Sequence, residues 1–541
     1  MNRRHFVQLT ALATAQVFAA GCAHWSRRGE FGIEEASIPE LQGAMQSGHE
    51  SAVSLTEKYL RRITAIDQNG PQLNSVIELN PDALAIAREL DAERQAKGPR
   101  GPLHGVPVLI KDNIDTHDRM MTTAGSLALV GSIPPQDSTV ARRLREAGTV
   151  ILGKTNLSEW ANFRGNRSIS GWSGRGGQTR NPYGLDRNPS GSSSGSGAAV
   201  SASLCAFAIG TETDGSIVSP ASHCGIVGLK PTVGLISRAG IIPISHSQDT
   251  AGPMTRTVTD AALVLGALVG IDSRDSATDA SRGKTHPDYA QFLDAEGLRG
   301  ARIGVARRFF SSSSRANRVL ESAIEVMKGC GAQIIDPAEL PTHGKFGGPE
   351  HELMLYEFKA GLNAYLASLG PNAPIQSLQD VIDFNARNKE RELRFFGQET
   401  MIAAQKKGPL TERAYLDAVA NARRLAGKEG IDAVMDQHRL DALVAPTSGP
   451  AGLIDFVYGD RGEGGSSSPA AVAGYPNITV PGGDAFGLPM GLSFFGRAWS
   501  EPVLLKIAFA FEQQTKARRA PQFLPTLKLL GEKSPQNSFV P

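Results

Sequence analysis

Cysteine is scarce in this sequence, and the few that occur follow no pattern. The chain of 541 residues contains Cys22, Cys205, Cys224 and Cys330 at unrelated spacings. A disulfide-stapled scaffold is short and rich in cysteine, and a zinc site needs cysteines or histidines paired at close spacing. The histidines are also scattered, and no HExxH motif occurs. We therefore expect no disulfide framework and no bound metal.

An excess of charge of one sign is lacking as well. The sequence contains 56 Lys and Arg residues and 54 Asp and Glu residues, so its net charge is +2. Proteins that bind nucleic acid usually carry a basic stripe, whereas the charge runs at 142–146 and 389–394 are typical of solvated helix faces. We expect no nucleic-acid partner. With 40% apolar residues, the chain has the composition and length of a globular protein with a large core.

Long hydrophobic runs are missing too, and the apolar stretch at residues 6 to 20 is interrupted by polar residues. It is shorter than the roughly 20 residues that a membrane-spanning helix needs. It follows the pair Arg3 and Arg4 and ends in FAAGC, a layout typical of an export signal of the twin-arginine type. The FAAGC end resembles a lipoprotein box, in which Cys22 would be lipidated and would anchor the protein to a membrane. Simple cleavage near Ala20 is the alternative, and either outcome predicts an exported protein, periplasmic or membrane-anchored.

The predicted signal occupies residues 1–22. After it, helical patterns alternate with short apolar runs, which is typical of an α/β fold. The box Ser54-Leu-Thr-Glu57 predicts the start of a helix. Further helices are expected over 138–147, 316–327 and 502–515, and strands over 108–110, 149–152, 207–209, 301–305, 443–445 and 478–480. The tail at 532–541 is expected to be disordered.

Two motifs in the chain match patterns of other enzyme classes. Residues 148–155, GTVILGKT, satisfy the phosphate-loop pattern, but their middle residues are strand-like where a phosphate loop needs a turn. Gly191-Ser-Ser193-Ser-Gly195 satisfies the nucleophile-elbow pattern, but a turn-like segment precedes it where an elbow needs a strand. We interpret the first as a strand followed by a loop and the second as a chance match, although spacing alone does not exclude a Ser-His-Asp triad.

The serine- and glycine-rich stretch at 189–199 runs into a helix-compatible segment of small residues and then into a buried strand. That strand leads to the polar segment 210–215 and to Ser216. A strand, a turn of small residues and a serine suit an exposed nucleophile, and successive backbone N–H groups in the turn could bind an oxyanion. A tight structural turn is the alternative, and the pattern alone leaves both open.

Three separated segments in this order resemble the amidase signature family: HGVPVLIKDNIDT at 104–116, PSGSSSGSGAAVSAS…GTETDGSIVSPASHCGIVGLKPT at 189–232, and AGYPNITVPGG…GLPMGLSFFGRAW at 473–499. The resemblance covers residues 35–520. It implies one large α/β domain whose central mixed, twisted β-sheet has helices on both sides.

The resemblance also implies a Ser-cisSer-Lys triad. The lysine matches Lys111, the bridging serine on a cis peptide bond matches Ser192, and the nucleophile matches Ser216. A buried lysine has its pKa lowered from about 10.4, so Lys111 would act as the base through Ser192. An acyl-enzyme on Ser216 would follow, and no cofactor is needed. Gly191 and Ser193 match the supporting loop.

The oxyanion donors match the backbone N–H groups of Thr213, Asp214, Gly215 and Ser216. Two positions depart from the family pattern: Ser190 and Asp214 each replace a glycine. Asp214 matters more, because its side chain could constrain the turn or contact the substrate.

Within the family, the segments at 156–197 and 211–216 look most like peptide amidases, which release ammonia from C-terminal peptide amides. We therefore predict an exported amidase of peptide or other small amides, with no obligate protein partner. A general aliphatic or aryl amidase and an oligoamide hydrolase are alternatives. The amidase subunit of tRNA-dependent amidotransferase shares the signature but is cytoplasmic. More remote are a non-catalytic anchored binding protein and an ATP-dependent enzyme using 148–155.

Overall fold

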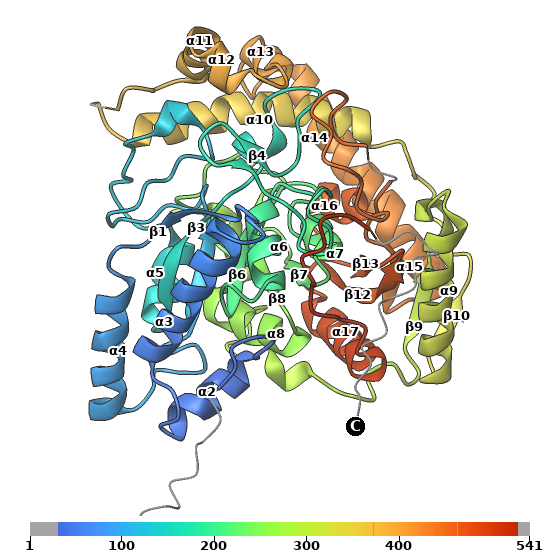
Figure 1. The fold of residues 1–541 in the computed structure, drawn as a ribbon. Coiled ribbons are helices and arrows are strands. Elements are labelled where there is room, and N and C mark those ends of the chain that lie inside the picture. Colours follow the sequence, from blue (N-terminus) through green and yellow to red (C-terminus); the bar gives the residue numbers. More distant parts are fainter. Residues whose placement is uncertain (1–30, 372, 462–463, 528–541) are drawn as a thin grey trace, which may run out of the picture.

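The computed structural model describes residues 31–371, 373–461 and 464–527. A mixed sheet of eleven strands runs through the molecule (Figure 1). Its strands, in spatial order, are β1 (Val76–Leu79), β3 (Val150–Thr155), β2 (Pro107–Lys111), β6 (Phe207–Glu212), β8 (Thr250–Thr255), β7 (Val227–Lys230), β12 (Asn477–Ala485), β13 (Leu488–Phe495), β11 (Ala442–Pro446), β9 (Arg302–Val305) and β10 (Gln333–Ile335). Strands β3, β2 and β6 are parallel, and β6 pairs antiparallel with β8. Strands β2 and β6 are buried along their whole length, which explains the apolar runs with which they begin.

Helices flank this sheet, as the resemblance implies for a single α/β domain. They are α2 (Ile38–Gln46), α3 (Ala52–Arg62), α4 (Ala83–Lys97), α5 (Thr139–Glu146), α6 (Ser194–Ser201), α7 (Val218–His223), α8 (Val258–Leu268), α9 (Ser314–Gly329), α10 (Gly347–Ser368), α11 (Leu378–Arg387), α12 (Lys389–Glu392), α13 (Glu399–Gln405), α14 (Arg413–Arg423), α15 (Ala433–His438), α16 (Ser467–Ala473) and α17 (Glu501–Thr515). Helices α10 to α14 gather at one end of the molecule, at the top of Figure 1, near the small hairpin of β4 (Trp172–Ser173) and β5 (Gly177–Gln178). A separate apolar cluster joins α10, α11 and α13 to the loops around Ala128, Trp160 and Ile242.

All six predicted strands are present, and so are the helices predicted over 138–147, 316–327 and 502–515. The predicted capping box at Ser54 is wrong. Helix α3 begins three residues earlier, with Ser51 as its N-cap and Ser54 completing the box from inside the helix. Both serines can cap a helix, and the choice depends on where Ala52 and Leu55 become buried. Strand β6 is longer than predicted, because it continues through Glu212.

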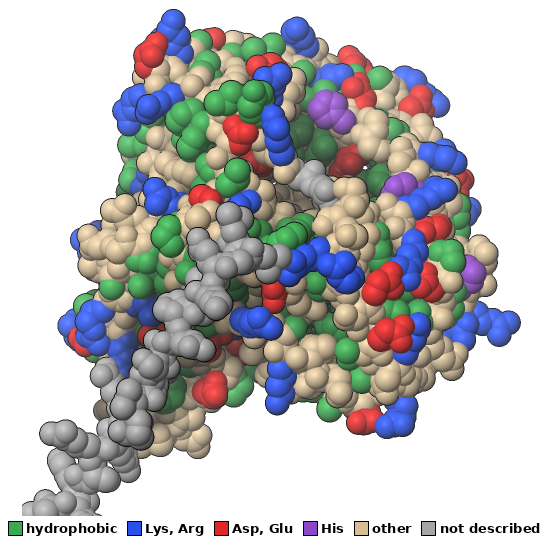
Figure 2. Space-filling model, turned by 45° about the vertical axis from the view of Figure 1, so that its right-hand side comes forward, with side chains coloured by type: hydrophobic (Ala, Val, Ile, Leu, Met, Phe, Trp, Pro, Cys, Tyr) green, Lys and Arg blue, Asp and Glu red, His purple; other side chains and the backbone are tan. Residues whose placement is uncertain are grey.

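Positive and negative side chains are interspersed on the surface seen in Figure 2. Among residues 31–371, 373–461 and 464–527, no helix is long and apolar enough to cross a membrane. The predicted signal at 1–22, with Arg3, Arg4 and Cys22, and the predicted tail at 532–541 lie outside the described residues.

Candidate active site

Lys111 is the last residue of β2, and it is completely buried. Because β2 and β6 are parallel neighbours, their carboxyl ends meet at one edge of the sheet, where α/β proteins place their ligand sites. The Lys111 Nζ atom lies 2.8 Å from Ser192 Oγ, 2.9 Å from Thr211 Oγ1 and 3.2 Å from the Thr211 carbonyl oxygen. The structure thus brings the predicted lysine and bridging serine into direct contact.

Burial lowers the pKa of Lys111 to about 7, because an ammonium loses its hydration inside the protein. The carboxyl groups of Glu212 and Asp249 act in the opposite direction but do not cancel this effect. A lysine with this pKa is neutral in a large fraction of molecules at neutral pH, so its nitrogen can accept a proton.

Ser192 lies in the tight loop that precedes α6. The peptide bond between Gly191 and Ser192 is cis, and Ser192 and Ser193 are fully buried. A Cβ atom at Gly191 would collide with the Ser158 hydroxyl, so glycine is required there. Ser190 has a φ of +60°, a backbone conformation that glycine adopts most easily, which explains why this position is a glycine in the family pattern.

Ser193, the serine of the elbow match, contacts the end of β6. Its hydroxyl donates to the Thr211 carbonyl oxygen at 3.1 Å and accepts from the Thr211 N–H at 3.2 Å. Its own N–H donates to the carbonyl oxygen of Ser216 at 3.1 Å. Ser193 therefore holds the Ser192 loop against the Ser216 turn.

The turn after β6 carries Ser216, which keeps 8% of its surface exposed. The buried Glu212 carboxylate accepts hydrogen bonds from the N–H groups of Ile217 and Val218 and fixes the far side of the turn. No described residue accepts a hydrogen bond from the N–H groups of residues 214, 215 and 216. Three successive unpaired N–H groups are unusual in a buried segment, and they suit the binding of an oxyanion.

The Asp214 carboxylate is fully engaged by the protein. Its two oxygens accept hydrogen bonds from the hydroxyls of Ser467 at 2.5 Å and Ser468 at 2.6 Å, at the start of α16. Burial and the charge of Asp214 both raise the pKa of Glu350 in α10. Of the two roles that the sequence leaves open for this side chain, the structure favours constraint of the turn.

Several residues near the site have no counterpart in the sequence prediction. A small cavity next to the turn is lined by Asn113, Ala161, Thr211, Thr213, Arg238, Ile241, Ile242, Ile244, Asp249 and Thr250. Asn113 donates to Thr211 Oγ1 at 3.0 Å, and Asp249 accepts from the Thr213 hydroxyl at 2.6 Å. Asn113 is only two residues from Lys111, so the sequence could have indicated a role for it near the site. No local signal in the sequence indicated Asp249.

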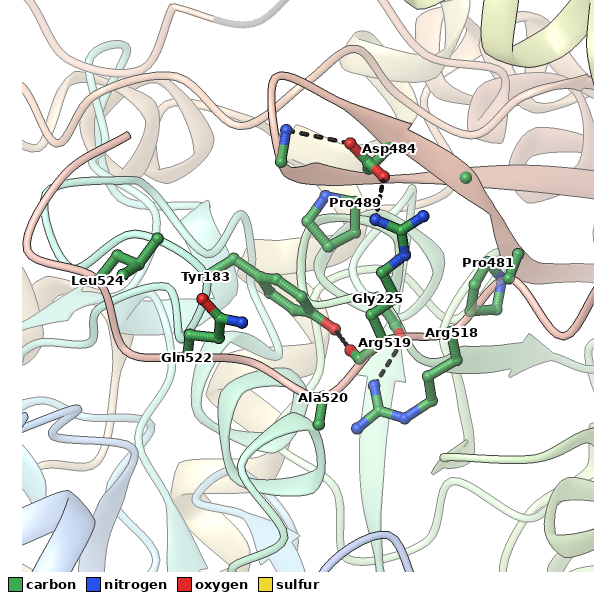
Figure 3. Close-up of a pocket in the computed structure, with 13 residues that line it drawn as sticks. Tyr183, Gly225, Pro481, Asp484, Pro489, Arg518, Arg519, Ala520, Gln522 and Leu524 are labelled. Carbon is green, nitrogen blue, oxygen red and sulfur yellow. Dashed lines mark hydrogen bonds and ion pairs between the residues drawn. The ribbon is translucent and has the colours of Figure 1, made fainter. Parts of the chain in front are cut away.

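A larger pocket, shown in Figure 3, lies between the β12–β13 hairpin and the segment 517–524. Arg519 forms an ion pair with Asp484 at 3.2 Å, and the Tyr183 hydroxyl donates to the Arg519 carbonyl oxygen. None of the predicted site residues lines this pocket.

The phosphate-loop match at 148–155 contains a strand, as expected, but the expected loop after it is wrong, because β3 continues through Thr155. The buried Lys154 side chain donates to the carbonyl oxygen of Ile114 and to Thr122. Lys154 is thus bound within the core and faces no phosphate site. The described residues contain no group of three or more His, Cys, Asp or Glu side chains arranged to hold a metal ion.

The buried lysine in contact with a serine, beside a turn with unpaired N–H groups, can supply a base, a nucleophile and an oxyanion site for acyl transfer. A sequence model of the Amidase family matches residues 54–505, so the chain belongs to the amidase family. A probable amidase of Arabidopsis thaliana is 43% identical over 526 residues, which span 95% of this chain and 97% of that protein.

Two solved structures extend the comparison to the fold. The native peptide amidase from Stenotrophomonas maltophilia is 54% identical, with a TM-score of 0.86, and the match covers 90% of this chain and 99% of that one. A peptide amidase in complex with the competitive inhibitor chymostatin is 54% identical, with a TM-score of 0.87 and coverage of 91% and 100%. The protein is therefore an amidase that hydrolyses carbon–nitrogen bonds.

Proposed function

We propose that the chain is a serine amidase in which Lys111, Ser192 and Ser216 form the catalytic triad. The contact of 2.8 Å between Lys111 Nζ and Ser192 Oγ carries the proposal, because burial leaves this lysine neutral in a large fraction of molecules at neutral pH. The two N–H groups of a neutral lysine are taken up by the hydroxyl and carbonyl oxygens of Thr211. Its lone pair then faces Ser192 and accepts the proton of that hydroxyl.

The reaction follows from this arrangement. Ser192 passes its proton to Lys111 and takes the proton of Ser216, whose oxygen attacks the amide carbonyl. The N–H groups of the turn, Thr213 to Ser216, stabilise the resulting oxyanion. Ser192 then protonates the departing nitrogen and takes a proton back from Lys111, the C–N bond breaks, and an ester to Ser216 remains. Water attacks this ester by the same proton route in reverse and regenerates the serine.

We further propose C-terminal peptide amides as substrates and ammonia as the released product. The support is the 54% identity to peptide amidases along nearly the whole of both chains. The test is ammonia release from N-blocked peptide amides, free Asn and Gln, and fatty and aryl amides. Fast release from peptide amides is expected, and activity confined to the other amides would refute this substrate class.

The triad is tested with Ser216→Ala, which should reduce the rate by about 10⁴-fold or more while leaving the fold intact. Ser201→Ala, at a buried serine of α6 outside the site, is the matched control and should keep full activity. Equal activity in the two variants would refute Ser216 as the nucleophile.

Export is proposed from the N-terminal sequence alone. In a bacterial host, replacing Arg3 and Arg4 by lysine should leave uncleaved protein in the cytoplasm. If Cys22 is lipidated, Cys22→Ala should move the protein from the membrane fraction to the soluble periplasm. Unprocessed wild-type protein in the cytoplasm would contradict the proposal.

A further inference from the structure

The turn that carries Ser216 is anchored by a buried acidic residue from a distant helix. Glu350 lies in the first turn of α10 and is 6% exposed, and the charge of Asp214 acts on its carboxyl group. Glu350 Oε1 also accepts a hydrogen bond of 3.0 Å from Gln248, which donates to the Thr213 carbonyl oxygen at 3.3 Å. Glu350 is thus linked to two successive residues of the turn.

The proton positions in this group follow from its contacts. Both carboxyl oxygens of Asp214 already act as acceptors, from the hydroxyls of Ser467 and Ser468. Glu350 accepts through Oε1 and must offer a proton to Asp214 through its other oxygen, because two adjacent carboxylates would repel each other. Burial and the charge of Asp214 raise the pKa of Glu350 to about 9, in agreement with a neutral carboxylic acid.

We propose that Glu350 is a positioning residue for amide hydrolysis: its neutral carboxyl group donates to Asp214 and thereby fixes the direction of the backbone N–H groups at 214–216. The inference rests on the proposed function of this turn in binding the oxyanion. Those N–H groups act on charge that develops in the transition state, so their displacement lowers kcat more than it changes KM.

Other titratable groups surround the pair, and the experiment must separate them. Asp249 binds the Thr213 hydroxyl, and burial raises its pKa to about 6. Lys230, whose pKa burial lowers to about 8, and the buried Glu212 both interact electrostatically with Asp214. Since all three remain in Glu350→Gln, a comparison of this variant with the wild type isolates the ionisation of Glu350.

The test compares kcat and KM across pH for five variants: Glu350→Leu, Glu350→Gln, Asp214→Gly, the double variant Asp214→Gly with Glu350→Leu, and Glu352→Leu. Glu350→Leu should reduce kcat by about ten- to a hundredfold, less than the loss of a whole oxyanion donor. Glu350→Gln keeps both a donor and an acceptor, so it should retain kcat at pH 7 and should lack the fall in kcat that the wild type shows as pH rises through about 9. In an Asp214→Gly background, which removes the partner carboxylate, Glu350→Leu should have little further effect. Glu352→Leu, at a partly exposed residue of the same helix that pairs with Lys407 away from the turn, should leave activity unchanged.

Three outcomes would overturn the inference: unchanged kcat in Glu350→Leu, an alkaline fall that persists in Glu350→Gln, or additive losses in the double variant. If Glu350→Leu does not fold, the pH profile of kcat in Glu350→Gln still tests the positioning role of Glu350. Full activity in Ser216→Ala would refute the proposed function instead, so the two failures are distinguishable.

Discussion

At residue 215 the backbone has a φ of +78°, in the left-handed region where a side chain costs about 1–2 kcal/mol. A Cβ atom there would also lie 3.0 Å from the hydroxyl of Ser467, which binds Asp214. Gly215 therefore lets the turn direct its N–H groups while it packs against the start of α16. By contrast, Asp214 has no positive φ, so a side chain in place of the family glycine causes no backbone strain.

Gly215→Ala should consequently lower kcat by about a hundredfold, the effect of losing one oxyanion donor. Steady-state ammonia release measures this, with circular dichroism to verify the fold. Gly43→Ala, in α2, where no atom lies within 4 Å of the added Cβ, is the matched control and should keep full activity. A similar loss in both variants would contradict the role given to the turn.

The pKa of Lys111 predicts the acid side of the pH profile. The base is active only when neutral, so kcat/KM should rise with pH through about 7 and then level off until Glu350 begins to ionise. The measurement is kcat/KM of a peptide amide between pH 5 and pH 10. An acid limb centred near 4 would identify a carboxylate rather than Lys111 as the essential base.

At the scale of elements, the helical layer of α10 to α13 is attached to the site loops by a buried ionic group. Arg164 is fully buried and lies 2.5 Å from Glu159 and 3.7 Å from Glu392 of α12. Its guanidinium also covers the ring of Phe396 at 3.8 Å and donates to the carbonyl oxygen of that residue. Glu392 in turn accepts from the N–H of Leu127 at 2.8 Å.

Arg164→Met should destabilise the protein by about 3–5 kcal/mol, because it leaves two buried carboxyl groups without their cation. The urea midpoint of unfolding measures this. Arg424→Met, at an exposed pair with Glu429, should cost less than about 1 kcal/mol. Adding Glu159→Gln and Glu392→Gln should recover part of the loss in Arg164→Met, and no recovery would show that packing rather than charge is involved.

At the scale of the whole molecule, chain segments from both ends form one core. The largest apolar cluster extends from Ile33 to Phe511, and the sheet places β7 from the middle of the chain beside β12 near its end. Neither half can bury its apolar surface alone, so the described part of the chain has the organisation of one cooperative unit.

We therefore expect a single unfolding transition, in which far-UV circular dichroism, tryptophan fluorescence and activity are lost together in urea. Trp160 and Trp172 report on the loops near the site, and Trp499 reports on the segment just before α17. Reducing agent should not move the midpoint, because Cys205, Cys224 and Cys330 are free. Two separated transitions would show that the helical layer folds as an independent unit.

Much of the fold could be predicted from the sequence because its signals are local. The apolar runs that became β2, β3, β6, β9, β11 and β12 are bounded by glycine, proline or charged residues, and buried strands need such runs. The ends of helices and strands are harder to predict from sequence than their presence. Ser51 and Ser54 have equal capping chemistry, and only the packing of α3 distinguishes them.

For the site, the sequence by itself determined the three motif segments and with them Lys111, the Ser192 loop and the Ser216 turn, since each motif is contiguous in the chain. Tertiary structure alone decided the partners that come from remote elements: Thr211 against Lys111, and Glu350 against Asp214. The contact between Glu350 and Asp214 joins residues more than a hundred positions apart. No periodicity or spacing encodes it, because it exists only when α10 packs beside the end of β6. The pKa values of both Lys111 and Glu350 likewise result from burial, which is a property of the folded chain.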